Sequence, residues 1–229
     1  MLETACGTGI ATEKIRAVLA DEVEIVTTDL NDAMLAIANE KRGNLPNVTY
    51  QQADALSLPF EDASFDAVAC QFGIMYYPDK DAGARKALRV LNSDGVFAFN
   101  VWGSFETNPA MRIAHETIIG FFESNLPTFL ETPFGYHFID PIKALLRDAG
   151  FDAIDIEMVN TAVERSSAHH VAVGAVEGNP GIFEVNEQAT TNRETVVEAV
   201  AQALRENLGD NPMRTPMQAI AATAQKPKG

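Results

Sequence analysis

The chain has 229 residues, of which 46% are hydrophobic, so it contains enough apolar material for one globular domain with a full core. Its 17 Lys and Arg residues are outnumbered by 32 Asp and Glu residues, and the net charge of −15 argues against a nucleic-acid backbone or an anionic membrane surface as the main partner. With only two cysteines and no Cys/His cluster at metal-ligand spacing, we expect a cytoplasmic protein without disulfides or a bound metal.

Short runs of β-branched and aromatic residues alternate with amphipathic helical stretches. This alternation is typical of an α/β fold in which a mostly parallel sheet carries helices on both faces. After a short strand at the N-terminus, we expect strands at Val23–Thr28, Val48–Gln52, Phe65–Phe72, Val96–Trp102, Ala153–Val159 and Met217–Ala224. The expected helices are Ala11–Leu19, Asp32–Lys41, Asp81–Leu91, Ala110–Glu123, Pro141–Ala149 and Glu194–Asn207, with Gly150 as a C-cap and a turn at 92–95.

The predicted first strand is abnormally short. Met1-Leu2-Glu3 leads straight into a glycine-rich turn, and three residues are too few for a central strand. We therefore expect that this strand is truncated and that a preceding portion is missing. Otherwise residues 1–229 are predicted to form a single domain.

Two longer segments do not belong to the regular alternation of strands and helices. Residues 103–138 are rich in Phe, Met and Ile, and we expect them to form a helical cover over a substrate pocket, although ordinary packing would also explain their amphipathic pattern. Residues 164–191 are rich in Ala, Gly, Asn and Thr and are predicted to be an irregular connection.

The strongest functional signal is the glycine-rich turn Glu3-Thr4-Ala5-Cys6-Gly7-Thr8-Gly9, which lies between a strand and a helix. Glycines at such a turn let the backbone bend sharply and let a ligand lie directly against the main chain. A purely structural strand-to-helix turn is the alternative.

Two aspartates follow the next two predicted strands. Asp29 ends the second strand, where a carboxylate can accept hydrogen bonds from both hydroxyls of a ribose, or can simply cap the following helix. Asp54 follows the third strand, where it can accept a hydrogen bond from an adenine amino group. Because ligands of open α/β sheets bind at the carboxyl ends of the strands, these two residues and the glycine turn predict one nucleoside site.

These motifs resemble the class I methyltransferases of the ubiquinone/menaquinone-biosynthesis type, also called the methyltransferase-11 group. The resemblance covers the first hundred residues and is carried by the segments 2–9 (LETACGTG), 28–35 (TDLNDAML), 53–60 (ADALSLPF), 64–68 (SFDAV) and 91–96 (LNSDGV). It implies a Rossmann-like, doubly wound sheet of seven strands, S-adenosylmethionine as cofactor, and methyl transfer to a small molecule.

The resemblance also implies which residues hold the cofactor. Glu3 would bind the ammonium of its methionine part, Asp29 the ribose, and Asp54 the adenine. The full set is Glu3, Ala5, Cys6, Gly7, Gly9, Asp29, Leu30, Met34, Asp54, Ala55, Gln71, Phe72 and Gly73. The chain departs from the family at Ala5, where glycine is usual, and we expect a tighter pocket or a slightly different turn there.

A methyltransferase does not require a catalytic side chain, because the sulfonium is already activated and alignment of the acceptor supplies much of the rate. If the acceptor must lose a proton, His137 or Tyr76 is the candidate base. Tyr76, Tyr77, Trp102, Phe134, Tyr136 and His137 are expected to line an apolar substrate pocket. Each of them has a structural alternative as a loop anchor or a core residue.

Two other classes of protein compete with this interpretation. An NAD(P)-dependent oxidoreductase would share the glycine turn and Asp29, but its third glycine would fall at Thr12. The chain would alternatively be a non-catalytic S-adenosylmethionine-binding protein or an inactive fragment. We expect no nucleic-acid or membrane partner, since no basic groove and no apolar run of ~20 residues occurs. A homodimer, the accepting atom and the pathway stay open.

Overall fold

The computed structural model describes residues 1–165, 167–178 and 181–228. The chain packs as two compact units, where the sequence predicts a single domain. Unit 1 comprises Met1–Val101, Phe138–Glu157 and Ile220–Gly229, and unit 2 comprises Trp102–His137 and Met158–Ala219. Two long strands run from one unit into the other, so no linker rich in Gly or Pro marks the division in the sequence.

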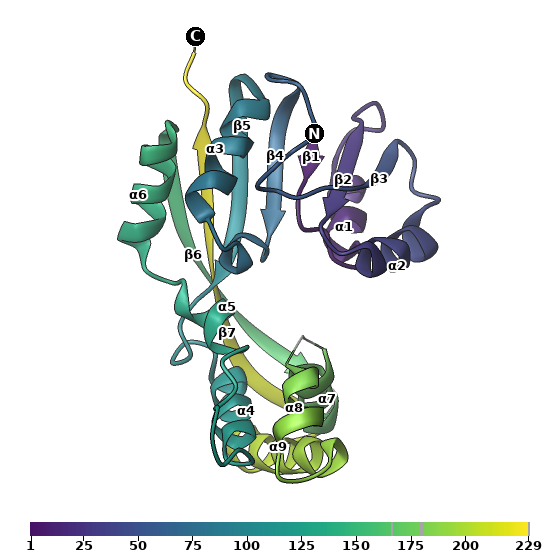
Figure 1. Ribbon diagram of the computed structural model, residues 1–229, viewed down its shortest axis with the longest axis vertical. Coiled ribbons are helices and arrows are strands. Elements are labelled where there is room, and N and C mark those ends of the chain that lie inside the picture. Colours follow the sequence, from purple (N-terminus) through teal and green to yellow (C-terminus); the bar gives the residue numbers. More distant parts are fainter. Residues whose placement is uncertain (166, 179–180, 229) are drawn as a thin grey trace. The chain divides into compact units, whose positions relative to one another are not determined.

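The strands form one sheet of seven in the order β3-β2-β1-β4-β5-β7-β6, coloured by sequence in Figure 1. Strand β1 pairs in parallel with β2 and β4, and the pairs β2–β3 and β4–β5 are parallel as well. The strands are β1 (Leu2–Glu3), β2 (Ile25–Asp29), β3 (Val48–Gln52), β4 (Phe65–Gln71), β5 (Leu91–Trp102), β6 (Asp152–Arg165) and β7 (Met213–Gln225). The predicted doubly wound, mostly parallel sheet with a short first strand is therefore confirmed.

Strand β5 begins five residues earlier than predicted. Its register jumps from the pair Phe65–Leu91 to the pair Ala67–Val96, so the four residues 92–95 lie opposite the single residue Asp66 of β4. Asp94 takes a φ of 63°, a left-handed conformation that turn-forming residues tolerate. The turn predicted at 92–95 is instead an irregularity inside the strand.

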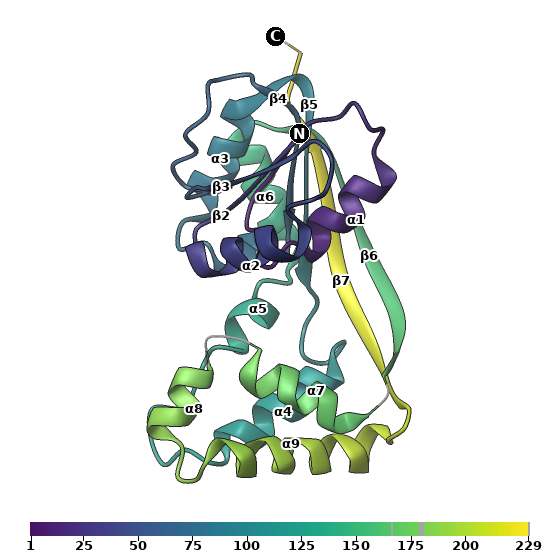
Figure 2. The ribbon, with the colours of Figure 1, turned by 90° about the vertical axis from the view of Figure 1, so that its right-hand side faces the viewer.

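Helices of unit 1 begin and end where local signals place them. The Asn31 side chain accepts hydrogen bonds from the N–H groups of Ala33 and Met34 and so caps α2, and Asp79 caps α3 in the same way. Gly150, with a φ of 102°, ends α6 as predicted. The helices are α1 (Ile10–Val18), α2 (Asp32–Arg42), the short η1 (Ile74–Tyr76), α3 (Lys80–Val90) and α6 (Ile139–Ala149). Figure 2 shows α3 and α6 on one side of the sheet and α1 on the other.

Unit 2 is mainly helical. Its helices are α4 (Pro109–Ile119), α5 (Glu131–Gly135), α7 (Ala168–Glu177), α8 (Ile182–Gln188) and α9 (Arg193–Leu208). Helices α4 and α5 lie within residues 103–138, where helices are predicted, while the role of that segment as a cover stays a prediction. None of the helices in the described part of the chain combines the length and apolar character that a membrane crossing requires.

The predicted irregular connection at 164–191 is wrong, because β6 continues to Arg165 and helices α7 and α8 follow. Residues 166, 179 and 180 of this segment lie outside the described residues. Helix α7 buries Ala168, Ala172, Ala175 and Val176 in the core that α9 and α4 share. Three of these four are alanines, which favour helix and permit close packing but do not give the pattern of large apolar residues that identifies a buried helix.

Asn108 fastens the start of α4 to β7 within unit 2. Its amide group is 2% exposed, donates to the backbone oxygens of Ser104 and Gln218 at 3.0 and 3.2 Å, and accepts from the Gln218 N–H at 3.1 Å. The side chain thus adds to the backbone hydrogen bond from the Gly103 N–H to the Gln218 oxygen, which joins the same loop and strand at 2.9 Å.

We expect Asn108→Leu to lower the free energy of unfolding by about 1–3 kcal/mol, because the Gln218 N–H loses its acceptor and the Ser104 and Gln218 oxygens each lose a donor. The control is Asn207→Leu, since the exposed Asn207 only donates to the Ala203 oxygen in the last turns of α9. It should change stability by less than about 0.5 kcal/mol. Urea titration measures both, and equal losses would contradict the role of Asn108.

Candidate functional site

The turn after β1 takes a backbone path that suits glycine. Ala5, Gly7 and Gly9 have φ values of 54°, 56° and 79°. At Gly9 a Cβ would lie 3.1 Å from both Ala38 and Arg42, so the absent side chain lets α1 and α2 approach closely. At Gly7 a Cβ would meet nothing within 4 Å, which leaves an open surface of main chain.

Asp29 holds this turn in place. Its Oδ2 accepts the Gly7 N–H at 2.8 Å, and its Oδ1 accepts the Asn31 N–H, also at 2.8 Å. Each carboxylate oxygen still has a lone pair for a further donor. The residue therefore joins the end of β1 to the segment before α2, whose cap is Asn31 and not Asp29, and its role in binding a ribose stays a prediction.

Asp54 lies beside Asp29 along the same edge. The Ala53 N–H donates to the Asp29 carbonyl oxygen at 3.1 Å, and Asp54 Oδ1 accepts the Leu56 N–H at 2.8 Å. Two large apolar side chains of this edge, Leu30 and Met34, are 65% and 40% exposed. Gly7, Asp29 and Asp54 thus form one surface with carboxylates, open main chain and apolar side chains, which we call the cradle.

Glu3 lies beneath the cradle and is only 1% exposed. Its Oε2 accepts the hydroxyl protons of Thr12 and Thr27, both at 2.6 Å, while Oε1 is buried with no hydrogen-bond partner. Burial raises the pKa of Glu3, and the two threonine hydrogen bonds oppose that rise. Sequence reasoning missed the two threonines, because a buried hydroxyl pair carries no spacing signal.

The chain matches known methyltransferases over its first part. A family model described as "Methyltransferase domain" matches residues 2–99. The ubiquinone/menaquinone biosynthesis C-methyltransferase UbiE of Idiomarina loihiensis is 43% identical over 98 residues, which are 42% of this chain and 39% of that protein. The chain thus matches well under half the length of this curated relative.

Residues 2–99, which are less than half of the chain, match the methyltransferase-domain family. The resemblance drawn from the motifs is therefore confirmed over these residues. The structure of YcgJ from Bacillus subtilis superposes with a TM-score of 0.63 at 19% identity and covers 100% of this chain and 92% of YcgJ. Haemonchus contortus phosphoethanolamine N-methyltransferase 2 in complex with S-adenosyl-L-methionine gives 0.60 at 18% identity, over 100% of this chain and 48% of that chain. These two structures support the fold.

The residues of the methyltransferase domain fit the cofactor that the resemblance implies. Gly7 offers open main chain, Asp29 and Asp54 offer carboxylates, and the orphaned Oε1 of Glu3 offers a buried acceptor for a cationic donor. Among the residues that the structure describes, no three His, Cys, Asp or Glu side chains gather as ligands for a metal. Burial raises the pKa of the Cys6 thiol to about 11, so Cys6 presents a neutral side chain.

The end of β4 interlocks with the turn after β1. Phe72 has a φ of 51°, and its N–H donates to Asn100 Oδ1 at 3.0 Å. Gly73 is buried, and a Cβ there would lie 2.5 Å from the Ala5 Cβ and 2.9 Å from Cys70 Sγ. The Ala5 methyl, present where the family usually has glycine, therefore occupies the space beside Gly73. It restricts the backbone of residues 71–73.

The Tyr77 side chain packs and forms a hydrogen bond within residues 2–99. Its hydroxyl donates to Thr4 Oγ1 at 3.2 Å and lies 3.3 Å from Cys70 Sγ, while Gly83 on α3 leaves room for its ring. This arrangement matches the structural alternative of a loop anchor. Tyr76, which is 52% exposed, is more accessible than Tyr77.

The other predicted substrate residues belong to unit 2. Trp102 stacks on Phe134 at 6.0 Å between ring centroids, and Phe134 stacks on Phe105 at 5.0 Å. His137 Nδ1 lies 2.7 Å from the Phe134 oxygen, in the same segment as Tyr136. The stack ends on His115, whose ring centroid lies 5.2 Å from that of Phe105. The Nε2 atom of His115 lies 3.4 Å from Glu131 Oε1. The sequence analysis did not single out His115, because it lies inside an ordinary helical pattern.

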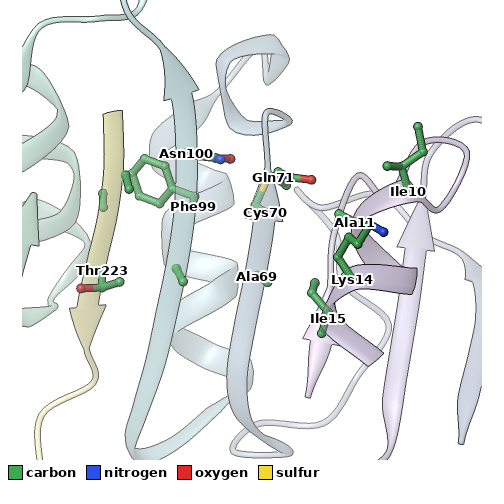
Figure 3. A pocket seen from close by; sticks show the side chains of 13 residues that line it. Ile10, Ala11, Lys14, Ile15, Ala69, Cys70, Gln71, Phe99, Asn100 and Thr223 are labelled. Carbon is green, nitrogen blue, oxygen red and sulfur yellow. The ribbon is translucent and has the colours of Figure 1, made fainter. Parts of the chain in front are cut away.

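An apolar hollow lies elsewhere on the sheet of unit 1. It has a volume of about 340 Å³ and is lined by residues of α1, β4, β5 and β7, as Figure 3 shows. Of the predicted cofactor residues only Gln71 lines it. The hollow lacks the open main chain of Gly7 and both aspartates, so it is not the cradle.

We expect Gly73→Ala to destabilise the protein by about 1–3 kcal/mol, because the new methyl overlaps Ala5 and Cys70. Combining it with Ala5→Gly should recover part of the loss, with a coupling energy of at least about 0.5 kcal/mol. Gly174→Ala is the control, since nothing lies within 4 Å of a Cβ there. Purely additive losses in urea unfolding would rule out the interlock.

The raised pKa of Glu3 predicts how stability depends on pH. The folded chain holds the proton more tightly than the unfolded chain, so the free energy of unfolding should fall as pH rises from the ordinary value of 4.5 through the raised pKa. Glu3→Gln should lack that fall and become more stable relative to the parent as pH rises. Urea unfolding at a series of pH values measures this difference, and parallel curves would contradict it.

Proposed function

We propose that this chain binds S-adenosylmethionine and transfers its methyl group to a small-molecule acceptor by direct in-line displacement. The observation that carries the proposal is the meeting of Gly7, Asp29 and Asp54 at one sheet edge, inside the part of the chain that matches the methyltransferase domain. The curated relative is named for the same reaction type, C-methylation in quinone biosynthesis.

The cofactor supplies a methyl group on a positively charged sulfur, which is a good leaving group. Asp29 accepts the ribose hydroxyls with the lone pairs that Gly7 and Asn31 leave free. Asp54 and Ala55 address the adenine edge, and the exposed Leu30 and Met34 pack against its ring. Glu3, Ala5, Cys6 and Gly9 complete the site on the methionine side, and Gln71, Phe72 and Gly73 lie beside the sulfonium.

On the acceptor side, the chain's contribution is orientation and exclusion of water, which account for several kcal/mol of the ~7–11 kcal/mol available from alignment. On the side of unit 1, Tyr76 is the acceptor-side residue of this proposal, whereas Tyr77 serves as a loop anchor. The roles of Trp102, Phe134, Tyr136 and His137 in acceptor binding, and of residues 103–138 as a cover, stay predictions. The base, where the acceptor needs one, is His137 or Tyr76. Burial raises the pKa of Tyr76, so its hydroxyl stays protonated at neutral pH and must act first as a donor.

Its partner is a small molecule, not nucleic acid or a membrane, because the net charge of −15 repels polyanions. We place the protein in the cytoplasm and keep a homodimer as its candidate assembly. The cofactor requires no metal.

Cofactor binding is tested by calorimetry with S-adenosylhomocysteine. Asp29→Ala and Asp54→Ala should each weaken binding by roughly 10- to 100-fold, since each removes a charge-assisted hydrogen bond worth about 1.5–3 kcal/mol. The control is Asp66→Ala. Asp66 lies near the start of β4, away from the strand's carboxyl end, and its carboxylate accepts a hydrogen bond from the Asn92 side chain. Unchanged affinity in both cradle variants, or tighter binding of a nicotinamide dinucleotide, would contradict the site.

Methyl transfer is tested by incubating the protein with S-adenosylmethionine and a panel of small planar acceptors that includes hydroquinones. The expected result is formation of S-adenosylhomocysteine together with an acceptor heavier by one methyl group, and both are lost in Asp29→Ala. Binding of the cofactor without transfer to any acceptor would instead support the non-catalytic alternative.

A further inference from the structure

The unusual group beneath the cradle is the buried carboxyl of Glu3, whose two oxygens differ in their hydrogen bonds. Both threonine hydroxyls, from α1 and β2, donate to Oε2 at 2.6 Å. Oε1 receives nothing and is fully buried. If the group is neutral, its proton therefore resides on Oε1, because Oε2 already accepts two hydrogen bonds.

The surroundings of Glu3 contain acids rather than cations. Asp29, Cys6 and Tyr50 interact with it electrostatically, and each becomes negative when it ionises. The arginines of the helices packed beside it are committed elsewhere in the described chain. The two terminal nitrogens of Arg16 donate to the oxygens of Val23, Leu19 and Ala20, while its Nε is buried without a hydrogen-bond partner. Arg42 binds Glu13 and the Thr8 oxygen.

Burying a carboxylate without a neighbouring cation costs much free energy. Burying a neutral acid with one hydrogen-bonded oxygen costs less. The pKa of Glu3 is raised for this reason, with desolvation as the largest cause. The methionine part of the proposed cofactor carries an ammonium, which is the kind of group that the site lacks.

We infer that cofactor binding releases a proton: Glu3 is the neutral acid in the free protein, and the cofactor's ammonium takes the place of its Oε1 proton. This inference rests on the proposed function. In the step, the O–H bond of Glu3 breaks, the proton goes to solvent, and the carboxylate pairs with the incoming ammonium, so charge and atoms balance. Thr12 and Thr27 are positioning residues that keep Oε2 occupied and Oε1 available.

The test is calorimetry with S-adenosylhomocysteine in buffers of different ionisation enthalpy, from about pH 5 to about pH 7, where the ligand's own amino group stays protonated. The parent protein should release up to one proton per bound ligand at the acid end and progressively fewer as pH rises. Its affinity should rise with pH by at most about tenfold per unit.

Two controls separate Glu3 from the rest of the cradle. The ligand 5′-methylthioadenosine has the adenosyl group but no ammonium, and its binding should release no proton. Glu3→Gln should still bind S-adenosylhomocysteine, more weakly than the parent does at neutral pH, and should release none.

Variants of the threonines should change the pH dependence of proton release, which a purely structural role would leave unchanged. Thr12→Val removes a hydrogen bond that favours the carboxylate, so proton release should persist to higher pH, whereas Thr12→Ser should behave like the parent.

Binding of S-adenosylhomocysteine without proton release by the parent, or with equal release by Glu3→Gln, would overturn the inference while leaving the cofactor site intact. Failure of the parent to bind either adenosyl ligand would overturn the proposed function itself, and the inference with it.

Discussion

Two hydrogen bonds from backbone N–H groups to one carboxylate organise the cradle. Asp29 accepts from Gly7 after β1 and from Asn31 at the start of α2, both at 2.8 Å. The turn is thereby fixed in the folded chain, and the open main chain at Gly7 faces the space that a ligand would fill. Because the backbone of the turn is already ordered in the folded chain, a ligand that binds there loses less free energy to ordering it.

Residues that break local rules gather around this contact. Ala5 and Phe72 adopt positive φ values without being glycine, Glu3 is buried with an oxygen unpaired, and Leu30 is 65% exposed. Positive φ values also occur elsewhere in unit 1, at Ala63, Asp94 and Ala153, so left-handed backbone alone does not mark the cradle. The buried carboxyl oxygen of Glu3 that lacks a partner is the feature that supports a functional site here independently of the family motif.

The sequence was most informative where a rule links spacing to geometry. Parallel strands bring their carboxyl ends to one edge, so the nearness of Gly7, Asp29 and Asp54 was predictable once the strands were placed. The short β1 and the end of α6 at Gly150 were predictable for similar local reasons.

The rest depended on tertiary packing. The alanine-rich face of α7 gives no strong periodic signal, so the local sequence of residues 164–191 does not reveal this helix. The division into two units follows from β6 and β7 continuing past the sheet of unit 1, and strand length is poorly encoded locally. The internal use of Tyr77 and the threonine pair on Glu3 involve partners distant in sequence, which spacing cannot reveal.

The most direct measurement of the central claim is a two-dimensional amide NMR titration of the protein with S-adenosylhomocysteine. The account predicts that the amide signals of Gly7, Asn31 and Leu56 move most, because their N–H groups are bonded to Asp29 and Asp54. If those signals stay still while the signals of Ala98 and Ala222 in the apolar hollow move, the ligand binds elsewhere and the account is wrong.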